Sequence, residues 1–542
     1  MQLDFQMLIG DSFTIEQSAK IAGVSTATIR NWIKTKYLIQ SDKGLISKDS
    51  LEYFMLNIAG KEKLNSRANK SKKNISESNS EKRNPKSIIF DLKGKDIGMQ
   101  YENSLSDSYR NKEGIYYTPE WVVEDMLKGV LVNKDTTFLD PCCGSGNFII
   151  QAIRLGVSPE NVYGFDTDEN AVAIAKNRIK DEFGYDTPNI LVADFLIEAQ
   201  CLRQRNVFFD LIFTNPPWGK KIDKHLKEHF ASVYDCGNSV DTTSLFMGAC
   251  LFLLSSSGYL GFLVQEAFFN IASYADIRKR VLSKKILQLI DYDRVFKGLM
   301  TKAQAVVILN ETPRDDTLIN CCYNGISYCR SIFSFNNNPY QIMNFWADED
   351  DAEIINYLYS IDHITLKGKA KWALGIVTGN NKKYCRNTKE NDNFLPIYKG
   401  SDITKNGLKE ANTFILNELS SFQQVAPSDM YYASEKIIYR FISSDLCFFF
   451  DNKQRLVLNS ANILIPTDLE ITFQQLTDIL NSEVINWLFK KLFMTNKVLR
   501  GDIELLPIHI GYFKMFNTFD NELFLDYLNL TKDNNGTFKI KK

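Results

Sequence analysis

The four consecutive residues Asn215-Pro216-Pro217-Trp218 combine an amide, a rigid carbonyl and a flat ring, which suits chemistry at an amino group on an aromatic base. Such an amine is a poor nucleophile because its lone pair is delocalised into the ring. The Asn215 side-chain oxygen and the Pro216 carbonyl can accept hydrogen bonds from its two N–H groups and draw the nitrogen toward tetrahedral geometry. Paired prolines hold that carbonyl rigidly, and Trp218 offers a surface on which a base can stack. The structural alternative is a turn that merely contains two prolines.

A glycine-rich segment over residues 138–148 (FLDPCCGSGNF) predicts a ligand-binding turn. Residues 136–139 are typical of a buried strand, and the residues after Asn147 are typical of a helix. Between them, Gly144 and Gly146 allow the backbone to approach a ligand closely. The pattern is D-x-x-x-G-x-G rather than the G-x-G-x-x-G of dinucleotide sites, which argues against a dinucleotide.

A second strand is expected over residues 162–165, and it ends in Asp166. Asp166 lies 20 residues after Gly146, the distance at which an acid on the second strand can accept hydrogen bonds from ribose hydroxyls. A helix over residues 171–179 follows. The pattern therefore predicts a strand–helix–strand unit that binds a nucleoside.

Two more strands complete the pattern. The strand over residues 190–193 ends in Asp194 and Phe195, an acid and a ring that suit the amino group and the face of an adenine. The strand over residues 209–213 leads into Asn215, at the carboxyl end, where α/β sheets bind ligands. The alternation of strands and helices predicts an α/β fold with a Rossmann-like core.

These motifs, in this order, resemble the S-adenosylmethionine-dependent amino-methyltransferases, and most narrowly the gamma-class N6-adenine DNA methyltransferases of restriction–modification systems. In that family the cofactor motifs come first, the catalytic motif follows, and the target-recognition domain is last. Residues 114–119 (GIYYTP) are similar to the leading motif, which contacts the methionine end of the cofactor. Residues 295–296 and 302–309 are similar to the later motif, whose aromatic residue packs on the flipped base. The resemblance covers residues 100–312.

The resemblance assigns roles to individual residues. It implies that S-adenosyl-L-methionine is the cofactor, that no metal is required, and that the target adenine rotates out of the duplex to lie between Trp218 and Phe296. Cys142 and Cys143 stand where small residues are common in the family, and we interpret both as compact core groups. The implied catalytic residues are Asn215, Pro216, Pro217, Trp218 and Phe296, and the implied cofactor-binding residues are Tyr117, Thr118, Pro119, Asp140, Pro141, Gly144, Gly146, Asp166, Asp194, Phe195 and Asn215.

Residues 313–542 carry no familiar catalytic set, and parts of them resemble a TaqI-like specificity domain. Turn-forming Gly and Asn residues near Lys and Arg suit a mixed α/β surface that reads phosphates and base edges of double-stranded DNA. A packing domain that binds a protein is the alternative. The similar segments are residues 372–382, 436–440, 458–462, 496–502 and 506–508, and the expected DNA contacts are Asn380, Asn381, Lys382, Arg440, Lys497 and Arg500.

Residues 13–38 predict two short helices that are separated at Gly23, because apolar residues recur at helical spacing. Ser25 can cap the second helix. The pair resembles a helix-turn-helix of the MerR-like or excisionase type, whose second helix would enter a major groove. A helical hairpin used for docking is the alternative. The expected DNA contacts of this module are Thr26, Thr28, Arg30 and Asn31.

Composition limits the remaining classes. The chain has 542 residues, of which 44% are hydrophobic and 24% charged, as in an ordinary multidomain globular protein. A net charge of -1 excludes a uniformly basic nucleic-acid coat, although residues 1–100 and 364–542 carry an excess of Lys and Arg around an acidic centre. No segment reaches the roughly 18 apolar residues of a membrane span, and residues 245–254 predict buried core. Ten cysteines without metal or disulfide spacing, and no signal peptide, favour the cytoplasm.

Two other patterns carry less weight. Residues 225–229 (HLKEH) match an H-x-x-E-H metal motif, but they lie in a charged segment with few other histidines, so we expect a solvated helix. Residues 91–93 (DLK) are similar to part of a nuclease D-x-K motif. The region before them is too short for a convincing nuclease domain.

The expected domains are a helix-turn-helix module (1–60), a flexible basic linker (61–90), a catalytic domain (91–312) and a target-recognition domain (313–542). This organisation predicts a site-specific DNA adenine methyltransferase with double-stranded DNA as partner and a cognate restriction endonuclease encoded separately. Two alternatives stay open. One is a methyltransferase that acts on an RNA base or on protein glutamine, which rarely carries so long a C-terminal domain. The other is a helix-turn-helix regulator with a vestigial methyltransferase fold, which the intact Asn-Pro-Pro-Trp motif opposes.

Overall fold

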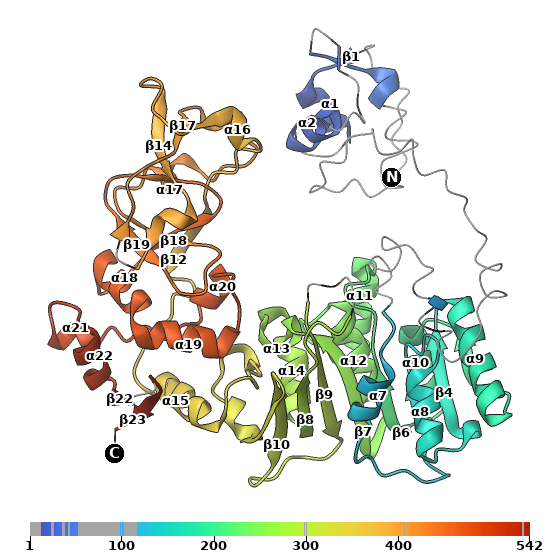
Figure 1. The fold of residues 1–542 in the computed structure, drawn as a ribbon. Coiled ribbons are helices and arrows are strands. Elements are labelled where there is room, and N and C mark those ends of the chain that lie inside the picture. The colour runs from blue at the N-terminus through green and yellow to red at the C-terminus, as the bar shows by residue number, and fades with distance from the viewer. Residues whose placement is uncertain are drawn as a thin grey trace. The chain divides into compact units, whose positions relative to one another are not determined.

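The computed structural model describes residues 12–22, 26–34, 38, 40–41, 44–51, 98, 100–101, 116–296, 299, 301–405, 407–533 and 536–541. They belong to two compact units, Met1–Asn84 and Pro85–Lys542 (Figure 1). Several features singled out in the sequence lie outside the described residues: Gly23, Ser25, the expected linker at 61–90, residues 91–93, Gly114 and Ile115.

The N-terminal unit contains a pair of helices and a two-stranded ribbon. Apolar side chains spaced at helical period pack together inside it, among them Ala19, Ile29 and Trp32. The two helices expected over residues 13–38 are therefore confirmed. The elements are β1 (Ser12–Phe13), α1 (Ile15–Ala22), α2 (Thr26–Lys34) and β2 (Ile46–Ser47), which pairs antiparallel with β1.

A nine-stranded sheet forms the centre of the larger unit, in the order β11-β10-β8-β9-β7-β6-β3-β4-β5. The strands from β7 to β5 run parallel, whereas β9 is antiparallel to both of its neighbours. The expected α/β class is confirmed. Chain order reverses at β3, because β4 lies on one side of it and β6 on the other, and such a switch point opens a crevice at the carboxyl ends of the strands. The strands are β3 (Phe138–Asp140), β4 (Val162–Asp166), β5 (Ile190–Val192), β6 (Phe209–Thr214), β7 (Leu254–Gln265), β8 (Lys285–Asp291), β9 (Ala303–Leu309), β10 (Leu318–Tyr323) and β11 (Ile326–Ser331).

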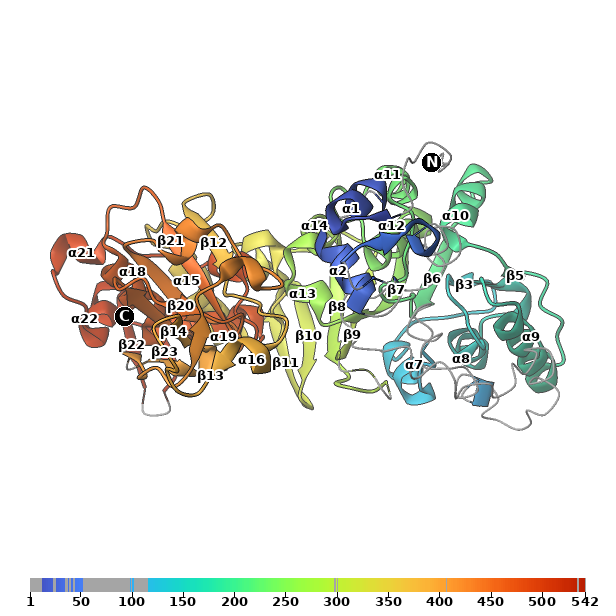
Figure 2. The same cartoon turned by 90° about the horizontal axis from the view of Figure 1, so that it is seen from above.

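Helices cover both faces of this sheet, so its central strands are apolar on both sides. Figure 2 shows α10, α11, α12 and α14 on one side and α7, α8 and α9 on the other. Successive strand residues alternate accordingly: Leu139 and Ile212 belong to one apolar cluster, and Phe138 and Leu211 to the other. The helices are α7 (Glu120–Met126), α8 (Asn147–Leu155), α9 (Glu169–Phe183), α10 (Phe195–Gln204), α11 (Lys224–Val233), α12 (Thr242–Leu253), α13 (Ala267–Asn270) and α14 (Ala275–Leu282).

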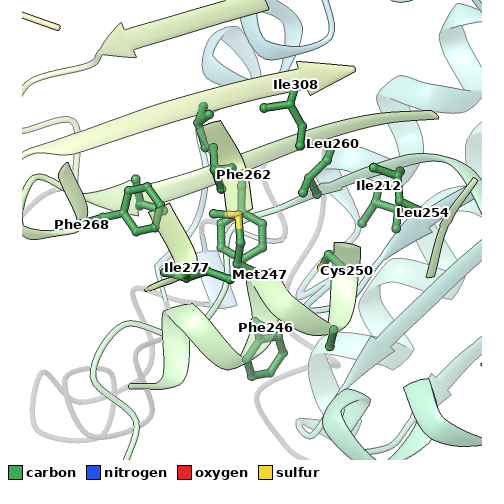
Figure 3. Packing of buried hydrophobic residues seen from close by; sticks show 14 of the residues in the cluster. Ile212, Phe246, Met247, Cys250, Leu254, Leu260, Phe262, Phe268, Ile277 and Ile308 are labelled. Atoms are coloured by element: carbon green, nitrogen blue, oxygen red, sulfur yellow. The ribbon is translucent and has the colours of Figure 1, made fainter. Parts of the chain in front are cut away.

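Helix α12 contains most of the apolar segment that the sequence assigned to buried core. Met247 and Cys250 are fully buried there, and Figure 3 shows them among Leu260, Phe262 and Ile308 of the sheet. The assignment to core is confirmed. Among the described residues, no helix is both long and apolar enough to cross a membrane.

Past residue 312 the chain first extends the sheet and then builds a second region. The boundary expected at residue 312 lies inside the sheet, since β10 pairs with β8 and with β11. Two four-stranded sheets follow, in the orders β12-β21-β18-β19 and β13-β17-β14-β20, and helices pack beside them, as expected for a mixed α/β region. The strands are β12 (Ala370–Leu374), β13 (Cys385–Arg386), β14 (Phe394–Tyr398), β17 (Phe414–Leu416), β18 (Lys436–Arg440), β19 (Phe448–Asp451), β20 (Leu456–Val457) and β21 (Ala461–Pro466), and the main helices are α15 (Glu349–Ser360), α16 (Asn381–Tyr384), α18 (Phe473–Asn481), α19 (Glu483–Phe493), α20 (Arg500–Ile503), α21 (Tyr512–Met515) and α22 (Asn521–Tyr527).

Hydrogen bonds connect the C-terminal region to the nine-stranded sheet. The carbonyl of Lys491 in α19 accepts from Asn344 Nδ2 at 3.1 Å and from Trp346 Nε1 at 2.8 Å. The carbonyl of Phe493 accepts from Asn270 Nδ2, at the end of α13, at 2.7 Å. The end of α19 is therefore held against segments that follow β7 and β11.

Candidate active site

The glycine-rich turn between β3 and α8 uses backbone conformations that its glycines permit. Gly144 has φ of 48° and Gly146 has φ of 89°, both in the left-handed region. A Cβ atom at Gly146 would lie 3.1 Å from the Cβ of Ala175 in α9. The Gly144 amide donates to Asp166 Oδ2 at 2.9 Å. The carboxylate at the end of β4 is therefore held beside the turn.

A cleft runs along the carboxyl ends of β3, β4, β5 and β6. It consists of two adjoining cavities that both have Tyr116, Cys142, Gly144 and Asn215 in their lining. Of the residues expected to bind the cofactor, Pro119 and Gly146 do not line either cavity. The expected residues that do are Tyr117, Thr118, Asp140, Pro141, Gly144, Asp166, Asp194, Phe195 and Asn215.

Three lining residues, Lys220, Ile222 and Phe246, were not identified from the sequence. Lys220 Nζ lies 3.5 Å from Thr167 Oγ1, which lines the same cavity. Burial raises the pKa of Asp166, and the Lys220 ammonium opposes that rise. The ring of Phe246 stacks on Phe195 with centroids 5.8 Å apart. No spacing rule marks these residues, because they come from a loop and a core helix.

The Asn215 amide is oriented by the leading motif. Its Nδ2 donates to Thr118 Oγ1 at 3.2 Å and to the Tyr116 carbonyl oxygen at 3.3 Å. Its Oδ1 is buried, and no described residue donates to it. Because a buried acceptor without a donor costs about 1–3 kcal/mol, this oxygen is suited to accept a hydrogen bond from a ligand.

A chain of hydrogen bonds supports that orientation from behind. The Thr118 carbonyl accepts from Asn147 Nδ2 at 2.7 Å. Arg178 of α9 in turn donates to Asn147 Oδ1 at 2.7 Å and to the Ser145 carbonyl at 2.6 Å. The Asn215 amide, the leading motif and the glycine turn are therefore linked. In the sequence, the one sign that Asn147 has a special role is its position as a polar residue at the start of an apolar helix. Nothing in the sequence marks Arg178 as part of the site.

Asp140 lies at the carboxyl end of β3. It lines the cavity that also contains Tyr117 and Thr118, here called the second cavity. Its Oδ1 accepts from Thr214 Oγ1 at 2.8 Å and from the Cys142 amide at 3.1 Å. Burial raises the pKa of Asp140 to about 7, while these two hydrogen bonds act in the opposite direction and the neighbouring Asp166 adds to the rise.

The expected sandwich of Trp218 and Phe296 around a base differs from the arrangement in the structure. The two rings meet edge to face, with centroids 5.2 Å apart. Tyr116 packs on both, at 6.2 Å from Trp218 and 5.7 Å from Phe296. A base between two rings needs a separation of about 7 Å, twice a van der Waals contact. The rings close on one another because contact buries their apolar surface. Tyr116 of the leading motif is a third ring at this site, and its packing on the other two was not predicted.

In the C-terminal region, an open groove, here called the basic groove, joins two of the expected DNA contacts to residues that were not predicted. Arg386 and Lys399 add positive charge to that of Lys382, and none of the described residues that line the groove is acidic. Arg386 is also paired with Glu390 at 2.8 Å. The groove is lined by Asn381, Lys382, Cys385, Arg386, Asn387, Lys399, Thr413 and Leu458.

The other expected contacts of this region have varied surroundings. The Asn380 side chain accepts from the Lys383 amide at 3.1 Å and so caps α16. Arg440 lies beside Gly400, next in the chain to Lys399 of the basic groove. Lys497 is exposed, whereas Arg500 is paired with Glu504 at 2.8 Å and lies over the ring of Trp372.

In the N-terminal unit, the expected DNA contacts Thr26, Thr28, Arg30 and Asn31 all belong to α2. Arg30 is exposed and Thr26 is half-buried, whereas the side chains of Thr28 and Asn31 lie outside the described residues.

The H-x-x-E-H pattern lies on α11, with His225 and His229 both exposed. Within the described part of the chain, no group of three or more His, Cys, Asp or Glu side chains is placed to hold a metal ion.

Comparison with known proteins places these features in a family. The model of the N-6 DNA Methylase family matches residues 93–365, and that of the TaqI-like C-terminal specificity domain matches residues 395–508. The Type II methyltransferase M.VspI of Vibrio sp. (strain 343) is 43% identical over 400 residues, which cover 73% of this chain and 97% of that protein. The Type II methyltransferase M.AccI of Acinetobacter calcoaceticus is 27% identical over 235 residues, 41% of this chain and 42% of that protein. The chain therefore belongs to the N-6 DNA methylase family and is a DNA methyltransferase of restriction–modification type with a TaqI-like specificity domain.

Proposed function

We propose that this protein transfers the methyl group of S-adenosyl-L-methionine to N6 of an adenine in double-stranded DNA. The observation that carries the proposal is the buried Oδ1 of Asn215, which has no donor among the described residues and stands in the lining shared by both cavities. An acceptor in that position suits an N–H group of the substrate. Membership of the family supports DNA as the substrate.

The chemistry of the cleft suits this cofactor along its whole length. Asp166, held beside the glycine turn, suits the ribose hydroxyls, and Asp194 with the stacked rings of Phe195 and Phe246 suits the adenine. Tyr117, Thr118 and Asp140 line the adjoining cavity, and their polar groups suit the charged groups of the methionine part. When bound, the cofactor supplies a methyl group already activated by a sulfonium.

The chain's own residues then position and polarise the amine. Asn215 Oδ1 and the Pro216 carbonyl accept hydrogen bonds from the two N–H groups of N6, which shifts electron density onto the nitrogen. Held in this way, the nitrogen lone pair would be directed at the methyl group that the cofactor would supply, with the sulfonium sulfur leaving as a neutral thioether. The surplus proton on nitrogen leaves to solvent. The Thr118 hydroxyl and the Tyr116 carbonyl keep Asn215 from rotating during this step.

Access to the amine requires the target nucleotide to leave the duplex, at a cost of a few kcal/mol. Trp218, Phe296 and Tyr116 offer aromatic surface for the extruded base. Stacking contributes about 1–3 kcal/mol per base, which offsets part of that cost. The three rings must separate to admit the base.

We further propose that the basic groove holds DNA for this reaction. Lys382, Arg386 and Lys399 can neutralise backbone phosphates, and Asn381 and Asn387 can donate to and accept from base edges. Arg440 and Lys497 extend the positive surface, and the match to a TaqI-like specificity domain supports this role.

For the N-terminal unit we propose a second DNA contact through α2. Arg30 is exposed on this helix, and the unit has an apolar core of its own, so the helix pair can fold and bind as a module. It would either extend the DNA footprint or bind the promoter of the protein's own gene.

Transfer of radioactive methyl groups tests the main proposal. We expect label in DNA and not in RNA or protein, and modification-sensitive sequencing of DNA from expressing cells should locate it on one adenine of a defined sequence. Label in RNA or protein with unlabelled DNA would overturn the proposal. Protection of that sequence against a separately encoded endonuclease would identify the partner enzyme.

A further inference from the structure

The residue immediately before Asn215 connects the catalytic motif to the cofactor turn. Thr214 ends β6 and Asp140 ends β3, the neighbouring parallel strand. The Thr214 side chain is 0% exposed and Asp140 is 1% exposed, and the hydroxyl of one donates to Oδ1 of the other at 2.8 Å. A buried hydroxyl that donates to a carboxylate across two strand ends holds both ends in register.

We propose that Thr214 is a positioning residue: its hydroxyl orients the Asp140 carboxylate toward the methionine end of the cofactor and fixes Asn215 relative to it. The inference rests on the proposed use of S-adenosyl-L-methionine. Oδ1 of Asp140 is occupied by Thr214 and by the Cys142 amide, so Oδ2 is left for the second cavity, which Asp140 lines. A rigidly held carboxylate there suits the ammonium group of the cofactor's methionine part.

Burial and a neighbouring carboxylate raise the pKa of Asp140, so its ionisation depends on the hydrogen bond from Thr214, which lowers that pKa. Asp166, at the end of β4, is the neighbouring charge, and it raises the pKa of Asp140. The thiols of Cys142, Cys143 and Cys250 also face it, but burial raises their pKa values well above the ordinary value, so they stay neutral near pH 7. The hydrogen bond from Thr214 favours the ionised form of Asp140 and so opposes the effects of burial and of Asp166.

The direction of the pH effect follows. A carboxylate that pairs with an ammonium binds it best when the carboxylate is ionised and the ammonium is protonated. Cofactor affinity should therefore rise as the pH increases through the pKa of Asp140, about 7, and fall again as the cofactor's α-amino group loses its proton at about pH 7.7–8.0, so the midpoint compared below is that of the rising limb. Thr214→Val keeps the volume and removes the donor. The pKa of Asp140 should then increase, and the midpoint of the binding curve should move upward by about one pH unit.

The experiment measures the dissociation constant of S-adenosyl-L-methionine by calorimetry between about pH 5 and 9, a range that spans about two units on either side of that midpoint. Thr214→Ser keeps the donor and should restore the wild-type curve. The matched control is Thr137→Val, since Thr137 Oγ1 donates to Asp210 Oδ2 at 2.9 Å, an equivalent bond between the same two strands at their other end. Thr137→Val should leave the midpoint unchanged, and thermal unfolding of each variant reports whether it is folded.

Asp140→Asn gives an independent reading that does not require Thr214→Val to fold. It should bind the cofactor more weakly and with no midpoint near pH 7. Wild-type binding with the same midpoint in Thr214→Val, or an unchanged midpoint in Asp140→Asn, would overturn this inference alone. Absence of binding by the wild-type protein at every pH would overturn the cofactor proposal, and this inference with it.

Discussion

The cleft at the nine-stranded sheet and the basic groove in the C-terminal region differ in how their polar side chains are held. In the cleft, a few partly buried polar groups are held by hydrogen bonds that connect Arg178, Asn147, Thr118 and Asn215. In the groove, cationic side chains lie on an open surface, and one of them, Arg386, also forms an ion pair with Glu390. Chemistry needs fixed geometry, whereas DNA recognition needs charge and donors that can adapt to a backbone.

This contrast indicates where single substitutions should act. Polar groups in the cleft are buried and mutually dependent, so loss of one leaves another unsatisfied. Charges on the groove are solvated and nearly independent, so each contributes a small part of DNA affinity. Substitutions in the cleft should therefore change the rate of methyl transfer, and substitutions in the groove should change DNA binding.

Asn215→Ala should have the largest effect. It removes the unpaired acceptor, and we expect kcat for methyl transfer to fall by about 10²–10³, the usual loss when one polarising group is removed. The cofactor dissociation constant should change far less. Single-turnover transfer and cofactor titration measure the two quantities. Asn215→Asp is the matched control, because it keeps an acceptor oxygen in place and should retain part of the rate. If Asn215→Ala methylates at the wild-type rate, the proposed chemistry is contradicted. The expectation that substitutions in the cleft change the rate of methyl transfer would then also be wrong.

Loss of an aromatic ring at the base site should come next. Trp218→Ala or Phe296→Ala should lower kcat/KM by about 10- to 100-fold, corresponding to about 1–3 kcal/mol of base stacking. Trp218→Phe keeps a ring and should retain most of the activity. Fluorescence of 2-aminopurine at the target position reports extrusion of the base directly. Equal extrusion in Trp218→Ala and wild type would show that the ring does not hold the base.

A single charge in the basic groove should matter less. Lys399 is half-buried in the groove lining, and Lys399→Ala should weaken DNA binding by less than about tenfold while lowering the slope of log K against log salt by about one. Methyl transfer at saturating DNA should keep its wild-type rate. The control is Lys514→Ala, which removes an exposed lysine of α21 that pairs with Glu470, and it should leave the slope unchanged. A changed transfer rate with an unchanged slope would move Lys399 from recognition to catalysis.

Removal of residues 1–84, the whole N-terminal unit, should have the smallest effect on catalysis. Because the unit has a separate apolar core, we expect an unchanged methylation rate and either a shorter DNA footprint or altered expression from the protein's own promoter. Footprinting and a promoter fusion check the two outcomes. If all three readouts stay at wild-type values, the proposed DNA contact of α2 is wrong.

The sequence was most informative where function depends on consecutive residues at a strand end. The elements carrying Asp140, Asp166, Asp194 and Asn215 were predicted close to their observed positions, because strand, turn and helix signals are local. The extension of the sheet by β10 and β11 was not predicted, although the two strands form a hairpin whose turn, Asn324-Gly325, is a local signal. The pairing of β10 with β8 joins segments farther apart and leaves no such signal. The sequence placed Tyr116 in the leading motif, but its contacts with Trp218 and Phe296 join three distant segments and were not predicted.

Residue types and their short spacings were enough to predict the type of chemistry, the order of the motifs and the α/β class. Three features became apparent in the folded chain alone: the Asn215 oxygen without a donor among the described residues, the hydrogen bond from Thr214 to Asp140, and the set of C-terminal lysines that share a groove. These features depend on packing between segments far apart in the chain, and burial there, rather than residue type, sets the energy of each polar group.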